Sequence, residues 1–456
     1  MSVVPSSAHP ADSAIYGHLW TTPEASALFS DEGRTQAWLR ILAALAQAQA
    51  DVGLIPPAAA DAIAGGADVT RLDLNLVAEQ TRATGHSTIG LIQALRAALP
   101  EYAREWVYYG ATVQDLSDTW FALVFRALGD IAERDVTRMR DRALELAAEH
   151  RLTPMCGRTH GQPGLPITFG FKAAVWAAEL GRHLQRLRQG RGRWEVVQLG
   201  GALGTMEFWG DRALGLLDAF AGRLGLGAPD VPWITARVGV AEFVWLLAAI
   251  SATVGKIGNE VYQLQRPEIG ELRESFTDGT VGSITMPHKR NPEISEHLVT
   301  LSRVIRAQAG LALEAMVCEH ERDGRAWKTE WLVVPETGMY TAACVGAGAR
   351  MLDGLHVDAG RMLSNIGQHR GYLLSEPVMR ALADHLGKHT AHEVVYTAAM
   401  NGIDAGQDFR TALRADARID AITDAELDDL LDVRASLGSC AAFADRVRRA
   451  CSGGRE

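Results

Sequence analysis

The sequence has few cysteines, and their spacing does not match a disulfide framework or a zinc-binding motif. Its five cysteines are odd in number and widely spaced, and no CxxC pair occurs. This argues against a disulfide framework and a zinc ribbon, and it favours reduced thiols of the kind found in the cytoplasm. The segment from Met1 to Trp20 lacks a basic region followed by an apolar run, and the longest apolar stretch, Phe243 to Val254, is too short to cross a bilayer. We therefore expect a cytoplasmic protein without a membrane segment.

Positive charge is also scarce. Lysine and arginine together number 45 against 55 aspartates and glutamates, the formal net charge is -10, and only five of the basic residues are lysines. This balance argues against a nucleic-acid-binding protein. It still allows a local cationic pocket for an anionic small molecule. With 47% apolar and 22% charged residues, the composition is typical of an ordered globular enzyme, and 456 residues predict two or three domains.

Proline is missing from long stretches, and no run alternates convincingly between apolar and polar residues as a strand would. Gln36 to Ala50 has apolar residues at helical spacing, and Thr168 to Gln198 and Val240 to Gln265 are each long enough for many helical turns. The last two are apolar on more than one face, which is typical of a bundle core or a subunit interface. We predict an all-α fold with a central bundle of long helices, buried further by oligomerisation.

Glycine clusters interrupt the helical pattern at 200–204, 278–283 and 346–348. The first is not a phosphate-binding loop, because no Lys-Ser or Lys-Thr follows it. Coarse boundaries fall near Tyr108 and Leu355. They predict an N-terminal helical domain (1–108), a central long-helix domain (109–354) that includes the glycine-rich loop at 278–283, and a C-terminal helical domain (355–456).

The most informative stretch runs from Gly282 to Pro292 and reads GSITMPHKRNP. A glycine-rich approach leads to Ser283, Met-Pro then turns the chain, and a lysine and an asparagine follow closely. A surface loop with a chance lysine would explain most short Gly-Ser-Lys strings. It does not explain the whole string.

This string resembles the GSxxMPxKxNP signature of the fumarase/aspartase superfamily. Two earlier segments resemble motifs of the same superfamily in the same order: Gly110 to Thr119 (GATVQDLSDT) and Gly157 to Gln162 (GRTHGQ). The resemblance implies an all-helical subunit in three domains. It further implies a homotetramer in which each active site is built from segments of three subunits. The implied chemistry is reversible elimination from a succinate-like dicarboxylate with release of fumarate, and we expect no cofactor.

The resemblance also implies catalytic roles. Ser283 matches the base that removes a proton next to a carboxylate, and His160 matches the acid that protonates the leaving group. The resulting aci-carboxylate carries two negative charges, which Lys289, Asn291 and nearby backbone amides would stabilise. Glu296 matches a carboxylate that orients the histidine in the adenylosuccinate lyase branch.

Substrate binding is implied for further residues. Thr112 and Thr159 match hydroxyls that bind substrate carboxylates. His86 lies where the adenylosuccinate lyase branch has a second active-site histidine, although a capping or surface role explains it equally well. The complete predicted binding set is Thr112, Gln114, Thr159, Asn291, His86 and Arg237. The string His385, His389 and His392 has metal-ligand spacing, but no cysteine or carboxylate pattern accompanies it, so we predict no metal site.

The residues favour two branches of the superfamily over the others but do not decide between these two. His288 and Arg290 favour the adenylosuccinate lyase and 3-carboxy-cis,cis-muconate cycloisomerase branches. In the first branch a serine-rich segment helps to bind the phosphate, and Glu321 to Trp331 replaces it here. In the second branch a glutamine stands where this chain has Ala236, and Val113 replaces a hydroxyl. These changes remove hydrogen-bond partners, so the substrate should differ from that of either branch.

We therefore predict a lyase that releases fumarate from a substituted succinate or an N-substituted aspartate, with an amine or nitrite as the leaving group. Lactonisation of the cycloisomerase type and adenylosuccinate lyase activity are the alternatives among enzymes. A non-enzymatic structural relative is the alternative from another class. The joint presence of Ser283, His160, Lys289 and Asn291 argues against it, because a structural role needs none of them.

Overall fold

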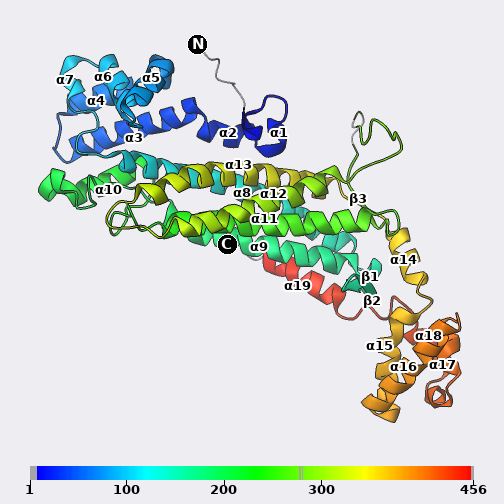
Figure 1. Cartoon of the computed structure of the whole chain (residues 1–456). Helices are drawn as coiled ribbons and strands as arrows, with labels where there is room; N and C mark the ends of the chain where they lie inside the picture. The colour runs from blue at the N-terminus through cyan, green and yellow to red at the C-terminus, as the bar shows by residue number, and fades with distance from the viewer. Residues whose placement is uncertain (1–7, 277–278, 280, 453–456) are drawn as a thin grey trace. The chain divides into compact units, whose positions relative to one another are not determined.

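The computed structural model describes residues 8–276, 279 and 281–452, and most of them are helical (Figure 1). Asp278 and Thr280 of the second glycine cluster lie outside the described residues. The described residues form two compact units. Unit 1 comprises the described residues of Met1–Asp135, His183–Val254 and Thr300–Gly346, and unit 2 comprises those of Val136–Arg182, Gly255–Val299 and Ala347–Glu456. The predicted all-α class is confirmed, whereas the division at 108 and 355 stays a prediction.

Five helices are the longest among the described residues. They are α8 (Val113–Glu149), α9 (Phe169–Trp194), α11 (Val238–Gln265), α12 (Glu293–Glu314) and α13 (Gly324–Asp353). The long helices predicted from the sequence correspond to α9 and α11 to within a few residues. Helix α9 begins where predicted because the Thr168 hydroxyl accepts a hydrogen bond from the backbone N–H of Phe171 (3.0 Å), which satisfies a donor at the helix start.

Unit 1 combines its portions of the long helices with shorter ones. The shorter elements are η1 (Pro10–Asp12), α1 (Gly17–Trp20), α2 (Pro23–Phe29), α3 (Asp31–Asp51), α4 (Pro57–Gly66), η2 (Val69–Arg71), α5 (Leu74–Thr84), α6 (Ile89–Ala98), α7 (Glu101–Arg104), η3 (Glu207–Arg212) and α10 (Ala213–Leu224). Helix α3 contains the helix predicted at Gln36 to Ala50, and it packs against α4 and α10. In the core, the ring centroids of Phe125 on α8 and Phe243 on α11 lie 4.5 Å apart. Aromatic pairs of this kind bury large apolar areas.

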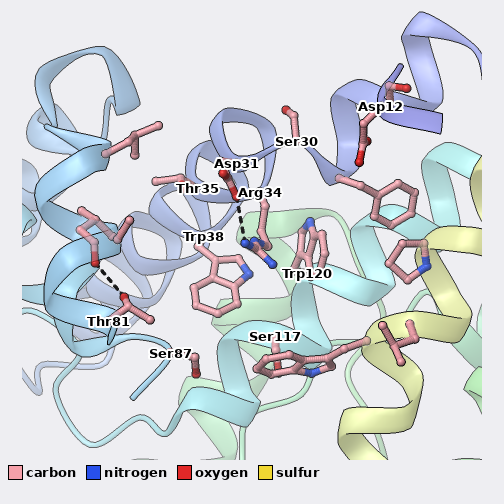
Figure 2. Close-up of a pocket in the computed structure, with 18 of the residues that line it drawn as sticks. Asp12, Ser30, Asp31, Arg34, Thr35, Trp38, Thr81, Ser87, Ser117 and Trp120 are labelled. Carbon is pink, nitrogen blue, oxygen red and sulfur yellow. Dashed lines mark hydrogen bonds and ion pairs between the residues drawn. The ribbon is translucent and has the colours of Figure 1, made fainter. Parts of the chain in front are cut away.

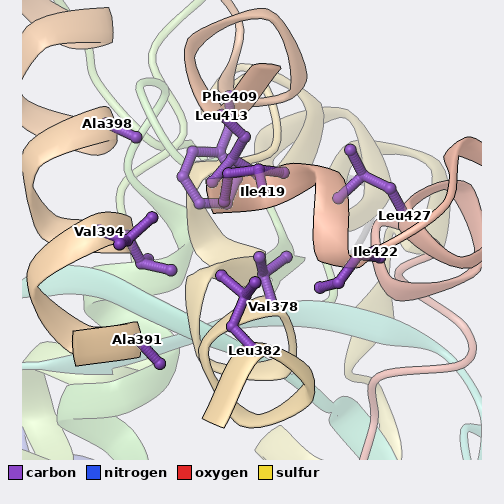
Figure 3. Close-up of a cluster of buried hydrophobic side chains, with 11 residues drawn as sticks. Val378, Leu382, Ala391, Val394, Ala398, Phe409, Leu413, Ile419, Ile422 and Leu427 are labelled. Carbon is purple, nitrogen blue, oxygen red and sulfur yellow. The ribbon is translucent and has the colours of Figure 1, made fainter. Parts of the chain in front are cut away.

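Unit 2 adds short strands and the C-terminal helices. These are β1 (Pro154–Thr159), β2 (Gln162–Thr168), β3 (Leu272–Arg273), β4 (His356–Val357), α14 (Ala359–Gly367), η4 (Tyr372–Leu374), α15 (Ser375–Leu386), α16 (Lys388–Asp404), α17 (Phe409–Arg414), η5 (Ala417–Ala421), α18 (Asp424–Leu430) and α19 (Cys440–Ser452). Figure 3 shows the hydrophobic cluster of the C-terminal helices, in which Val378, Val394, Phe409 and Ile419 are fully buried. This cluster gives the C-terminal helices a core of their own.

The GRTHGQ segment forms a β-hairpin rather than part of a helix. Strands β1 and β2 pair antiparallel with Thr159 opposite Gln162. Between them, His160 and Gly161 have φ angles of 53° and 76°, so both residues of the turn are left-handed, as a type I′ turn requires. The sequence pattern did not reveal these strands, because glycines and prolines disfavour strands and His-Gly is not one of the common hairpin pairs. The turn places His160 at the exposed tip of the hairpin.

Helix α11 is the one helix in the described part of the chain that is long and apolar enough to cross a membrane. This reflects length and composition only. In its most apolar window, 67% of the residues are buried inside the fold. Such burial is typical of a core helix.

Candidate active site

In unit 1, Asp115 connects two of the predicted segments. Its carboxylate accepts hydrogen bonds from the backbone N–H groups of Thr112 (2.9 Å), Gly200 (2.7 Å) and Gly201 (3.2 Å). Burial raises the pKa of Asp115 to about 7, while these N–H donors lower it. A buried acid therefore fixes the backbone of Thr112 against the glycine turn that begins at Gly200.

The hydroxyl of Thr112 has a cationic neighbour. Arg322 donates from Nη1 to Thr112 Oγ1 (3.0 Å) and from Nη2 to the carbonyl of Gly201 (3.3 Å). A guanidinium beside a hydroxyl is suited to binding a carboxylate. The sequence analysis did not assign Arg322 to the site. The only signal for it was the Glu321-Arg322-Asp323 string.

His86 has a capping contact. Its Nδ1 accepts a hydrogen bond from the backbone N–H of Thr88 (3.3 Å) and lies 3.1 Å from the Thr88 hydroxyl. Near this point Tyr108 adopts a left-handed backbone, with φ at 63°. Burial raises the pKa of Tyr108, whereas hydrogen bonds with the side chains of Thr88 and Thr112 lower it. The His86 and Thr112 segments of unit 1 are thus linked through Tyr108.

Two residues of the predicted binding set are buried among protein partners. Gln114 donates to the carbonyl of Ile234 (2.8 Å) and is 1% exposed. Arg237 is 2% exposed, and its guanidinium pairs with the carboxylates of Asp118 and Glu330. The predicted substrate contact of Arg237 is untested, and these contacts favour a structural role instead. The two carboxylates already occupy its donors.

In unit 2, an ion pair with a buried carboxylate anchors the hairpin. Arg158 donates from both terminal nitrogens to Glu271, at 2.8 Å and 2.7 Å. Asn365 donates to the same carboxylate (2.8 Å), and the Glu271 side chain is fully buried. Because Thr159 and His160 follow Arg158 directly, this anchor sets the position of the hairpin tip.

The signature loop of unit 2 is internally hydrogen-bonded. The Ser283 hydroxyl oxygen accepts from the backbone N–H of Met286 (3.0 Å), and Asn291 donates from Nδ2 to the carbonyl of Gly282 (2.9 Å). A Cβ atom on Gly282 would lie 2.2 Å from the carbonyl oxygen of Lys289. Only glycine permits this approach, so the loop conformation that presents Ser283, Lys289 and Asn291 depends on Gly282.

Helix α12 begins directly after the signature loop, and Glu274 caps it. The Glu274 carboxylate accepts hydrogen bonds from the backbone N–H groups of Ile294 (3.1 Å) and Ser295 (2.6 Å). Glu296 lies in the first turn of the helix and is exposed. A capped helix start thus fixes the backbone that carries this predicted carboxylate.

The predicted residues divide between the two units. Unit 2 holds Ser283, His160, Lys289, Glu296, Thr159 and Asn291, and unit 1 holds Thr112, Gln114, His86 and Arg237. Sequence reasoning missed the supporting acids Asp115 and Glu271, although Asp115 lies inside the Gly110 to Thr119 segment that resembles a family motif. Within the described ranges, no three His, Cys, Asp or Glu side chains gather in a way that could hold a metal ion.

Comparison with known proteins defines the class. The family described as Lyase matches residues 19–307, and the family described as Adenylosuccinate lyase C-terminus matches residues 371–447. The chain is 39% identical over 440 residues to N-acetyl-S-(2-succino)cysteine lyase of Enterococcus italicus, covering 96% of each chain. It is 38% identical over 446 residues to the enzyme of the same name from Dickeya dadantii, covering 98% of each. Its fold matches that of the 3-carboxy-cis,cis-muconate lactonizing enzyme from Pseudomonas putida with a TM-score of 0.90 at 32% identity, covering 97% of this chain and 99% of that one.

The all-helical fold and the Lyase family match define this protein as a lyase. The chain belongs to the fumarase/aspartase superfamily, as its three sequence motifs predicted.

Proposed function

We propose that this lyase releases fumarate from a succinyl thioether, an N-acylated S-(2-succino)cysteine, by β-elimination in the cytoplasm. The observation that carries the proposal is the similarity along the whole chain to two enzymes named for such a substrate. The sequence analysis predicted an amine or nitrite as the leaving group. A thiolate belongs to the same class of substituted succinates, and it replaces those two in the proposal.

The contacts of the signature loop support this chemistry. In the proposed step, the Ser283 alkoxide takes a proton from the succinyl CH₂ group, and the C–H electron pair passes into the neighbouring carboxylate. That electron pair then returns to form the C=C bond of fumarate as the C–S bond breaks and its own electron pair leaves with sulfur, and His160 supplies the proton that completes the thiol. The Met286 N–H, 3.0 Å from Ser283 Oγ, would stabilise the alkoxide, because a hydrogen bond to the charged form lowers a pKa.

Charge recognition would come from segments of different subunits, as the resemblance implies. A succinyl thioether carries two carboxylates next to the reacting carbons, so it needs cationic partners on both. Lys289 supplies one within the signature loop, and Arg322 with the Thr112 hydroxyl supplies another in unit 1. These groups would stabilise the negative charge that develops on the carboxylate as the proton is removed.

We also propose the homotetramer that the resemblance implies. Unit 1 exposes large apolar side chains on its long helices: Val238 and Trp245 on α11, Leu311 and Leu313 on α12, and Leu332 on α13. Exposed apolar groups of this kind are typical of subunit interfaces. Light scattering on the purified protein tests the tetramer.

Shared active sites can be tested by complementation. Ser283→Ala and Thr112→Ala are each expected to be inactive, and their residues lie in different units. If different subunits supply these residues, mixing the two variants under conditions of subunit exchange restores fumarate release, because some sites then contain both wild-type residues. No recovery despite proven exchange would contradict shared sites.

The activity is tested by following fumarate absorbance with N-acetyl-S-(2-succino)cysteine. The comparison panel is adenylosuccinate, argininosuccinate, nitrosuccinate and several N-substituted aspartates, with carboxymuconate assayed for lactone formation. We expect fumarate from the thioether. Fumarate from an amine adduct alone would return the leaving group to the sequence-based prediction, and lactone without fumarate would favour the cycloisomerase alternative.

A further inference from the structure

Unit 1 contains a cavity of about 880 Å³ that none of the predicted site residues lines. Residues of α2, α3, α5, α8 and α13 contribute to it (Figure 2). Its walls are mainly apolar and aromatic, with the indoles of Trp38, Trp120 and Trp331 among them. This volume lies in the range of small-molecule sites, which combine apolar walls with a few converging polar groups.

Trp38 presents a donor without an acceptor to this cavity. The side chain is 7% exposed, and among the described residues its indole N–H has no hydrogen-bond partner. A buried donor without an acceptor destabilises a fold, so natural folds rarely leave one. In Figure 2 the Trp38 nitrogen faces the guanidinium of Arg34, which lies between the rings of Trp38 and Trp120. Two donors therefore lie side by side, and an acceptor placed within reach of both would satisfy the Trp38 N–H and pair with Arg34.

Arg34 can turn toward such an acceptor at little energetic cost. Its hydrogen bond to Asp31 (Nη2 to Oδ1, 3.2 Å) lies at the surface, where the Asp31 side chain is 87% exposed. Exposed ion pairs of this kind contribute little to stability. The Arg34 guanidinium also lies 6.0 Å from the Trp120 ring centroid, which holds the cation beside the aromatic wall.

We propose that this cavity binds a planar small molecule that carries one carboxylate. The carboxylate accepts from the Trp38 N–H and pairs with Arg34, and the planar body packs among Trp120 and Trp331. A charged acceptor is favoured over a neutral one because one of the two converging donors is a cation. The inference rests on the cavity alone and does not depend on the proposed reaction.

The test is calorimetric titration of the intact protein with 1-naphthylacetate and with its neutral analogue 1-naphthylacetamide. We expect the carboxylate to bind once per chain and more tightly than the amide. Trp38→Phe keeps the ring and removes the N–H, and Arg34→Gln removes the charge. Each should weaken carboxylate binding by about tenfold, the effect of one charge-assisted hydrogen bond. Neither should change amide binding.

Two controls separate this cavity from the catalytic residues. Ser283→Ala should bind 1-naphthylacetate as the wild type does, and succinate should not displace the probe. If Trp38→Phe fails to fold by circular dichroism, Arg34→Gln, whose side chain is 44% exposed, still decides the question. Four results would overturn the proposal: no binding at millimolar probe, equal affinity for acid and amide, indifference to both substitutions, or displacement by succinate.

Discussion

The buried cluster of Arg237, Asp118 and Glu330 allows the sharpest prediction about unit 1. Arg237 donates to both oxygens of Asp118 (2.7 Å and 3.2 Å) and from Nε to Glu330 (2.9 Å), with a further bond from Nη2 to Glu330. The three side chains are at most 1% exposed. Burial lowers the pKa of Arg237, but the two carboxylates raise it by more, so the cation persists inside the fold.

Arg237→Met keeps the approximate volume and removes the charge. It leaves two carboxylates buried without a cation, and loss of one partner from a buried ion pair costs about 3–5 kcal/mol. The stacking of Arg237 on Trp233, 4.8 Å from guanidinium to ring centroid, is also lost. Proton uptake by the orphaned carboxylates limits the loss. We therefore expect the free energy of unfolding to fall by about 4 kcal/mol.

The assay is urea unfolding at fixed protein concentration, with Arg193→Met as the control. Arg193 also pairs with a carboxylate, that of Glu242, and lies 5.7 Å from the Trp194 ring, but its side chain is 54% exposed. The control should lose less than about 1 kcal/mol. If Arg237→Met is as stable as Arg193→Met and instead raises KM, the structural role is wrong and Arg237 binds substrate.

Three further predictions concern the supporting residues. Gly282→Ala should abolish most fumarate release with helix content unchanged, because its Cβ would collide with the Lys289 carbonyl; normal turnover would contradict that loop geometry. Glu271→Gln should lower kcat on the order of 100-fold, because it weakens the ion pair with Arg158 that positions the hairpin. An unchanged kcat would show that the position of the hairpin does not matter for catalysis. Burial raises the pKa of Asp115 from 3.8 to about 7. Between these two pH values the folded protein binds this proton more tightly than the unfolded chain does, so the free energy of unfolding increases as the pH falls and decreases as the pH rises. Urea titrations across this pH range should show a shallower pH slope for Asp115→Asn, and an identical slope would refute this.

The spacing of apolar residues along the sequence was enough to predict the long helices, but it did not predict the hairpin. Helices α9 and α11 were predictable because apolar residues recur at helical spacing over many turns and no proline intervenes. The hairpin of β1 and β2 was not, since its strands contain residues that disfavour strands. A histidine in the left-handed region also has no reliable signature in one sequence.

The predicted site shows the same limit. The motif strings led directly to Ser283, His160 and Lys289, because each motif is contiguous in the chain. Arg237 entered the predicted binding set from its motif string, and the sequence could not reveal its buried partners, because Asp118 and Glu330 are 119 and 93 residues away. Pairing at such separations depends on the tertiary fold, which periodicity and motif spacing do not encode.

The central claim is elimination with Ser283 as the base, and one comparison tests it most directly. Fumarate release from N-acetyl-S-(2-succino)cysteine would be measured for the wild type, Ser283→Ala and Thr285→Ala, the last being an exposed hydroxyl of the same loop. We predict a loss of at least about a thousandfold in kcat for Ser283→Ala, near-wild-type turnover for Thr285→Ala and equal thermal unfolding midpoints for all three. Substantial turnover in folded Ser283→Ala would contradict the account.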